Sequence, residues 1–190
     1  MTVSLAAGLC ACTTYNNFKN AFFEDGKEAQ ERTIKIGVFE PLSGKNKTEG
    51  NEELMGIELA HDLYPTVCGK KVELVYGDNK SDIYTGETVI QELISANSPS
   101  VILGSYGETL TLIAGKYAKA NNIPAITISS TNPLITTNND YYFSATYSET
   151  RQGDALADFA YTSQKKIVAA AIKTEDDDTA KGKNKRFKEP

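Results

Sequence analysis

From residue 33 onward, short runs rich in β-branched residues alternate with longer windows whose apolar residues recur at helical spacing. This alternation predicts an α/β fold, in which right-handed crossovers build a parallel, Rossmann-like sheet flanked by helices on both faces. The expected strands cover residues 34–39, 72–76, 101–103, 125–128, 141–143 and 167–172. The expected helices cover residues 50–63, 82–95, 108–120 and 149–162.

The helical windows also predict which side chains face the sheet. The apolar residues of the window 108–120 follow the spacing of an amphipathic helix; they are Leu110, Ile113, Ala114, Tyr117 and Ala118. The apolar residues of the window 50–63 are expected on one broad side of their helix; they are Leu54, Met55, Ile57, Leu59 and Leu63.

Small ligands of parallel α/β sheets bind outside the carboxyl ends of the strands. The segment after the expected strand 125–128 carries Ser129, Ser130 and Thr131, whose hydroxyls and backbone N–H groups can hold a carboxylate. The alternative is a helix cap without a ligand, in which Thr131 or Asn132 caps a helix that Pro133 begins.

The segment 104–108 opens the helix expected over residues 108–120. Its glycines permit close approach of the backbone, and a helix N-terminus favours anions. Tyr106, Gly107 and Glu108 are therefore further candidates for contact with a ligand. For Glu108 the simpler alternative is an acidic side chain that stabilises the helix N-terminus.

The chain lacks the motifs of the common α/β enzymes. Residues 104–107 do not supply the G-x-S-x-G elbow of the hydrolases. No G-x-G-x-x-G follows the first expected strand, and Asn46 stands where a phosphate loop needs Ser or Thr. The single histidine, His61, has Asp62 as its neighbour, and such neighbours do not face each other on a helix. We therefore predict a binding protein without catalytic residues or a cofactor; an enzyme on a flavodoxin-like sheet would need a constellation that these motifs do not provide.

Residues 1–12, MTVSLAAGLCAC, are small and apolar, and a polar stretch follows over residues 13–32. The run from Leu9 to Cys12 matches a lipobox, which predicts the remnant of a signal peptide, acylation of Cys12 and a polar tether over residues 13–32. The alternative is an ordinary apolar N-terminus, because the positive start of a signal peptide is missing. Cys10 and Cys12 have no second Cys/His pair, so no metal site is predicted. A net charge of −5 argues against a nucleic-acid partner.

Five segments carry a resemblance to a known family. They are IKIGVFEPLSG, GNEELMGIELA, ILGSYGETLTLIAGKYAKANNIPAITISSTNPLIT, YYFSATYSETRQGDALADFA and IVAAAIKTEDDDTAKGKNKRFKE. In this order they resemble type I periplasmic binding proteins, in particular the leucine/isoleucine/valine-binding branch. The resemblance implies a two-lobed, extracytoplasmic receptor that closes over a small solute, such as an amino acid, and delivers it to an ABC permease in the membrane. An alternative with the same fold is the ligand-sensing domain of a receptor or regulator.

The resemblance also implies a division of the chain and a place for the solute. Residues 33–147 would form the first lobe, and residues 148–190 only the start of the second, so we expect the isolated chain to bind weakly. The solute carboxylate would lie near residues 106–108 and 129–131. Two departures are visible: Glu108 replaces a serine common in the family, which predicts a solute other than a simple branched-chain amino acid, and Thr179 stands where a tyrosine is common.

Overall fold

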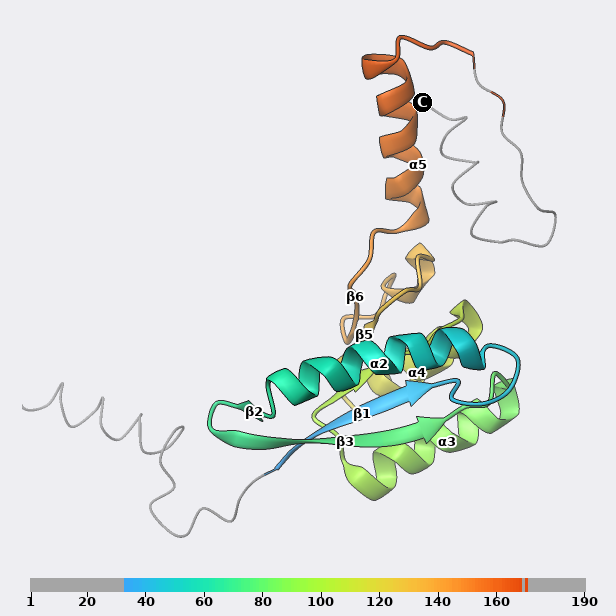
Figure 1. The fold of residues 1–190 in the computed structure, drawn as a ribbon. Helices are drawn as coiled ribbons and strands as arrows, with labels where there is room; N and C mark the ends of the chain where they lie inside the picture. Colours follow the sequence, from blue (N-terminus) through green and yellow to red (C-terminus); the bar gives the residue numbers. More distant parts are fainter. Residues whose placement is uncertain (1–32, 169, 171–190) are drawn as a thin grey trace, which may run out of the picture. The chain divides into compact units, whose positions relative to one another are not determined.

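A computed structural model describes residues 33–168 and residue 170 (Figure 1). The strands are β1 (Ile34–Glu40), β2 (Thr66–Val67), β3 (Lys70–Asp78), β4 (Val101–Leu103), β5 (Ala125–Thr127) and β6 (Tyr142–Ser144). The helices are α2 (Lys47–Leu63), α3 (Ile83–Asn97), α4 (Glu108–Ala120) and α5 (Glu149–Asp158). A 3-10 turn, η1, covers Pro133–Ile135, and a π-helical turn, η2, covers Phe159–Ser163.

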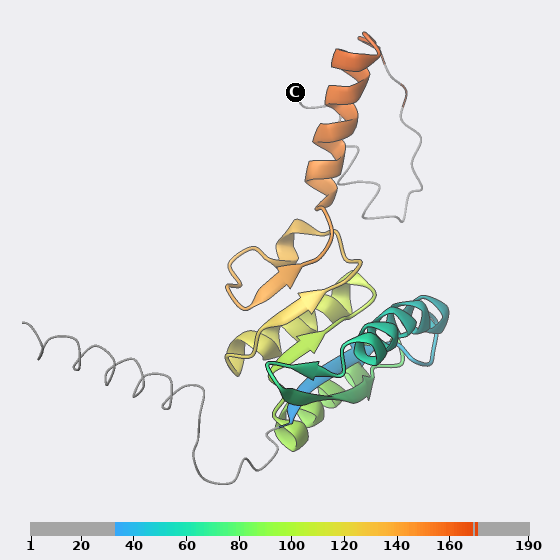
Figure 2. The same cartoon turned by 60° about the vertical axis from the view of Figure 1, so that its left-hand side comes forward.

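The strands form one sheet in the order β2-β3-β1-β4-β5-β6. All neighbouring strands are parallel except β2, which pairs antiparallel with β3. The chain moves from β1 to β3 on one side and then returns past β1 to β4, β5 and β6. Helix α2 lies on one face of the sheet, and α3 and α4 lie on the other (Figure 1, Figure 2). The predicted α/β fold is confirmed, and its order reverses between β1 and β4.

The main core lies between the sheet and helices α3 and α4. Its fully buried members include Phe39, Ile90, Ile102, Ala114 and Ala125. These positions confirm the helical spacing seen in the window 108–120, since Leu110, Ala114 and Ala118 are all buried.

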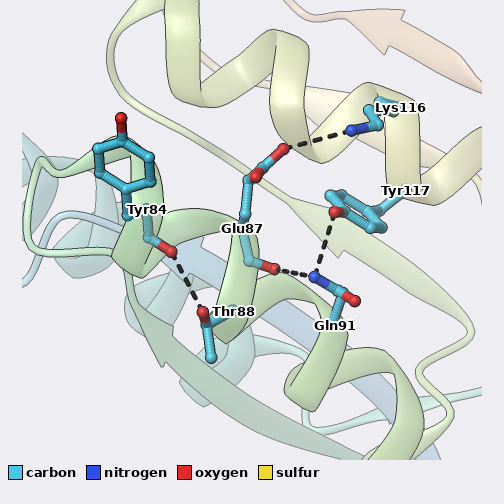
Figure 3. Close-up of polar contacts among 6 residues, drawn as sticks. All are labelled: Tyr84, Glu87, Thr88, Gln91, Lys116 and Tyr117. Atoms are coloured by element: carbon cyan, nitrogen blue, oxygen red, sulfur yellow. Dashed lines mark hydrogen bonds and ion pairs between the residues drawn. The ribbon is translucent and has the colours of Figure 1, made fainter.

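Polar side chains join α3 and α4 at the rim of this core (Figure 3). Lys116 Nζ lies 3.3 Å from Glu87 Oε1, and Gln91 Nε2 donates to the Tyr117 hydroxyl at 3.1 Å. The Lys116 ammonium also lies 5.0 Å from the centre of the Tyr117 ring. These contacts are solvent-exposed, so we expect them to orient the two helices more than to stabilise the fold.

The predicted apolar side of α2 is wrong in part. Ile57 is buried, but Met55, Leu59 and Leu63 are 62%, 60% and 64% exposed. The reason is that the buried residues of α2 are Gly50 and Ile57, so the helix faces the sheet with a different stripe. Any side chain at Gly50 would collide with Pro41, which shows how closely the helix approaches the loop after β1.

Helices α3 and α5 each begin at a residue whose side chain caps the first turn. The Asp82 carboxylate accepts from Thr85 N at the start of α3, and Ser148 Oγ accepts from Arg151 N at the start of α5. The short strand β2 was not predicted from the sequence. The helix cap given as the alternative after residue 128 is present at η1, which Pro133 begins and where Asn132 Oδ1 accepts from Leu134 N at 2.9 Å. Of the strand expected over 167–172, Ile167 and Val168 are irregular.

The predicted signal segment, the tether and the lipidation site Cys12 lie outside the described residues. Among residues 33–168 and 170, no helix is long and apolar enough to cross a membrane.

Candidate functional site

The candidate site lies where the strand order reverses, between the carboxyl ends of β1 and β4. Glu40, the last residue of β1, is fully buried, and its Oε2 accepts from the backbone N–H of Tyr106 at 2.7 Å. Crevices at such reversals are the usual ligand sites of open α/β sheets. The predicted loop 104–108 is therefore attached directly to the end of the first strand.

A second carboxyl group faces Glu40 from helix α2. The carboxyl groups of Glu40 and Glu53 lie close enough to share a hydrogen bond once one of them is protonated, and Glu53 Oε1 accepts from the hydroxyl of Ser129. Glu53 lies three residues after Gly50 and four before Ile57, so it shares their buried helix face. Residues from β1, α2 and the loops after β4 and β5 thus meet at one point.

Burial determines the protonation of this pair. It is the main cause that raises the pKa of Glu40 to about 9, and the neighbouring Glu53 raises it further, against the lowering effect of the Tyr106 amide. Burial also raises the pKa of Glu53, although hydrogen bonds from Ser129 and Glu40 oppose the shift. At neutral pH the pair therefore holds a proton on Glu40.

Several buried hydrogen bonds fix the loop that joins β4 to α4. Asn79 Nδ2 donates to Ser105 Oγ at 2.9 Å, and Thr111 Oγ1 donates to the Ser105 carbonyl at 2.6 Å. The Tyr142 hydroxyl donates to the Gly104 carbonyl. Because these donors come from three different elements, the loop backbone is held in place before any ligand arrives.

The loop after β1 is fixed in a similar way by Asp78 at the end of β3. Its carboxylate accepts from the backbone N–H groups of Leu42 and Ser43, at 2.9 and 3.1 Å, and from Ser43 Oγ at 2.6 Å. Burial alone would raise the pKa of Asp78, but the hydrogen bonds from Ser43, Lys80 and Leu42 outweigh it and lower the pKa.

The predicted residues after β4 begin at Tyr106, whose backbone N–H donates to Glu40. Tyr106 is half-buried, and burial, followed by the nearby charges of Glu49, Glu53 and Glu52, raises the pKa of its hydroxyl. Gly107 adopts a φ of 89° and begins α4 without a side-chain cap. This positive φ explains the choice of glycine there.

The predicted residues after β5 lie beside that loop. Glu108 Oε2 accepts from Asn132 Nδ2 at 3.1 Å, so the two loops touch. Ser129 is exposed, whereas Ser130 is buried and its hydroxyl has no hydrogen-bond partner. The Thr131 carbonyl accepts from Glu149 N at 2.9 Å.

Sequence reasoning did not find Glu40 and Glu53. The signal for Glu40 was its position as the last residue of the strand at the reversal of the sheet. The signal for Glu53 was its place between Gly50 and Ile57 at helical spacing. No group of three or more His, Cys, Asp or Glu side chains within the described part of the chain is placed to hold a metal ion.

Fold and site together define the class of protein: an α/β lobe whose polar loops converge at the reversal of a parallel sheet. Residues 33–185 match the family model described as periplasmic binding protein, and the chain belongs to this family. A curated relative is the Leu/Ile/Val-binding protein homolog 2 of Brucella abortus (strain 2308). It is 24% identical over 139 residues, which cover 72% of this chain and 35% of the relative.

Solved structures of ABC-transporter binding proteins share the fold. A leucine-binding protein, LivK, from Thermotoga maritima is 31% identical with a TM-score of 0.63, covering 70% of this chain and 38% of its own. LivJ from Streptococcus pneumoniae, in complex with isoleucine, is 28% identical with a TM-score of 0.71, covering 83% and 46%. A solute-binding protein from Rhodopseudomonas palustris BisB5, in complex with 3,4-dihydroxybenzoic acid, is 25% identical with a TM-score of 0.72, covering 83% and 43%. The chain thus spans about a third of the curated relative and less than half of each structure.

Proposed function

We propose that this chain forms the first ligand-binding lobe of an extracytoplasmic solute-binding protein and serves an ABC importer rather than catalysing a reaction. The observation that carries the proposal is the meeting of the loops 104–108 and 129–131 at the reversal of the sheet, joined by the contact between Glu108 and Asn132. The ligands of two of the similar structures, isoleucine and 3,4-dihydroxybenzoic acid, both carry a carboxyl group.

The hydroxyl groups of the second loop differ in what they can offer to such a solute. Ser129 donates its one hydroxyl proton to Glu53, so only its lone pairs remain for a ligand. Ser130 has a buried hydroxyl that makes no hydrogen bond in the described structure and keeps its donor. We therefore place the solute carboxylate toward Ser130, Thr131 and the backbone of Gly107, and a donor group of the solute toward Ser129.

The acidic side chains of this region favour a solute that carries a donor as well as a carboxylate. Glu49, Glu52 and Glu53 act on Tyr106 electrostatically from the first half of α2. A bare anion close to these residues would be repelled, whereas an amino acid or a hydroxylated acid can direct a donor toward them. Delivery to a membrane permease, and an anchor at Cys12, complete the proposed role.

Thermal denaturation in the presence of candidate solutes tests the proposal. Because one lobe alone would contact the solute from one side, we expect millimolar affinity. A solute present at ten times its Kd raises the free energy of unfolding by about 1.4 kcal/mol. We expect such a rise with an amino acid or a hydroxybenzoate.

Two matched variants locate the site. Ser130→Ala should abolish the rise, because it removes the free buried donor. Ser95→Ala makes the same chemical change on exposed α3 and should leave the rise intact. Equal effects of the solute on both variants would contradict the placement, and sub-micromolar binding would contradict the expectation that this chain holds only part of the site.

A further inference from the structure

A continuous chain of hydrogen bonds joins the two candidate ligand loops through the interior of the lobe. It runs from the backbone N–H of Tyr106 to Glu40, from Glu40 to Glu53, and from Glu53 to the hydroxyl of Ser129. Tyr106 belongs to the loop after β4, and Ser129 belongs to the loop after β5. The two carboxyl groups of Glu40 and Glu53 form the middle of this series of hydrogen bonds.

The carboxyl oxygens without a donor show where the series of hydrogen bonds between the two loops needs a proton. Glu40 Oε2 and Glu53 Oε1 have donors, but Glu40 Oε1 and Glu53 Oε2 are buried without one. Two ionised carboxyl groups present only acceptors to each other, so they cannot form the bond between them. One proton held between the two remaining oxygens satisfies both.

No cation replaces that proton within the described residues. The titratable groups on which the charge of the pair acts are Tyr142 on β6 and, for Glu53, Tyr106 on the loop. Neither tyrosine can supply a positive charge, and in the part of the chain that the structure describes neither Glu40 nor Glu53 forms an ion pair with Lys or Arg. A second negative charge on the pair would therefore have no positive partner.

We propose that Glu40 and Glu53 are positioning residues of the solute site, which tie the loop 104–108 to the loop 129–131 through one shared proton. This inference rests on the proposed function, since it assigns to those loops the contact with the solute. With the proton in place, α2 and the ends of β1, β4 and β5 are held together before the solute binds. Loss of the proton leaves two carboxylates face to face, and their separation withdraws Glu40 from the Tyr106 amide.

Three glutamine variants separate the shared proton from a general structural effect. In Glu40→Gln, the amide accepts from Tyr106 N and donates to Glu53, so the chain persists without a titratable proton. In Glu53→Gln, the amide accepts from Ser129 and donates to Glu40, which can then ionise. Glu52→Gln is the matched control, because Glu52 is an exposed acid on the same helix outside the chain of hydrogen bonds.

The first measurement is the infrared absorption of protonated carboxyl groups at neutral pH. We expect this band in the wild type and in Glu52→Gln, and we expect it to disappear in Glu40→Gln. Absence of the band in the folded wild type would overturn the proposal.

The second measurement is amide hydrogen exchange at Tyr106, expressed as a protection factor so that the intrinsic pH dependence cancels. Protection should hold up to about pH 9 and then fall about tenfold per pH unit in the wild type and in Glu52→Gln. In Glu40→Gln it should stay constant. The amide of Ile102, which donates to the Pro124 carbonyl in the sheet, reports unfolding of the whole lobe as an internal reference. Parallel curves for wild type and Glu40→Gln would overturn the proposal.

Solute binding at neutral pH completes the test, with L-isoleucine and 4-hydroxybenzoate as probes. Glu53→Gln should bind within about twofold of the wild type, whereas Glu53→Ala should bind about tenfold more weakly because both of its links are lost. Equal affinities of Glu53→Ala and the wild type would overturn the positioning role. If no solute binds the wild type, the proposed function fails, while the infrared and exchange results still decide whether the proton joins the loops.

Discussion

Replacement of Gly104 by alanine should destabilise the lobe more than its small size suggests. Gly104 follows β4 and adopts a φ of 106°, a conformation that residues with a Cβ atom rarely adopt. A methyl group at this position would collide with Glu40 Oε1 and with the backbone carbonyl of Phe39. Neither neighbour can move freely, because both belong to the buried end of β1.

The magnitude follows from two contributions. Backbone strain in a sparsely populated conformation costs about 1–3 kcal/mol. Forcing an extra carbon into a packed site costs roughly another 1–3 kcal/mol. We therefore expect Gly104→Ala to lower the free energy of unfolding by about 2–6 kcal/mol, a large part of the ~5–15 kcal/mol that stabilises an ordinary domain.

The assay is urea denaturation followed by circular dichroism, with Gly56→Ala as the matched control. Gly56 lies inside α2, and a Cβ atom there would meet no other atom within 4 Å. Alanine in a helix interior is favoured over glycine by about 0.5–1 kcal/mol, so the control should be slightly more stable than the wild type. A Gly104→Ala protein within about 0.5 kcal/mol of the wild type would refute both the strain and the collision.

Three further predictions concern the carboxylates and the core. The pKa of Glu40 is about 9 in the folded protein, against an ordinary value of 4.5. The free energy of unfolding should therefore fall as the pH rises between these two values, by at most ~1.4 kcal/mol per pH unit from this group. Urea titrations across this range should show a shallower fall for Glu40→Gln, and parallel curves would contradict the assignment. The pKa of Asp78 is lowered in the folded state, so its ionised form stabilises the fold, and Asp78→Asn should lower the free energy of unfolding by about 1 kcal/mol at neutral pH. This difference between wild type and variant should vanish as the pH falls through the folded pKa, and a difference that persists in acid would argue against the assignment. Ile90→Ala should lower the free energy of unfolding by about 2–5 kcal/mol because Ile90 is fully buried, whereas Leu59→Ala, at a position that is 60% exposed, should change it by less than about 0.5 kcal/mol. Equal shifts of the denaturation midpoint in the two variants would contradict this.

The fold was predictable because each element carries its own local signal. The helix α4 follows from five apolar residues at regular spacing, and β1, β3 and β4 follow from runs rich in β-branched residues. The two-residue strand β2 was not predictable from such runs, because its pairing depends on the antiparallel return to Lys70 and Lys71. The strand order was not predicted, because the crossover rule fixes the hand of each connection and not which strands become neighbours.

The exposed residues of α2 show where apolar periodicity misleads. Met55 and Leu59 were expected on the buried side because they belong, with Leu54, Ile57 and Leu63, to one broad apolar side of the helix. The helix instead approaches the sheet through Gly50 and Ile57, since the smallest residue allows contact with Pro41. The face of α2 that packs most closely against its neighbours is the buried one, and the sequence does not show which face that is.

The candidate loops were predictable from topology, but their internal support was not. Ser129, Ser130 and Thr131 were found because they directly follow a strand. Glu40 also follows from this rule, yet a carboxylate at the end of a strand gives no sign in the sequence that another carboxyl group will face it.

The partner of Glu40 comes from α2, and its place depends on how the helix is rotated about its axis. If Met55 and Leu59 faced the sheet, Glu53 would point away from β1 and the site would have no interior link. The observed rotation exposes apolar side chains and buries a second acid beside the first, and both consequences have an unfavourable free energy. The same rotation brings Glu53 to Ser129, so Glu53 connects α2 to the loop after β5 while Met55 and Leu59 stay exposed. The proposed role of Glu53 as a positioning residue accounts for this rotation, since burial of apolar area alone would favour the opposite helix face.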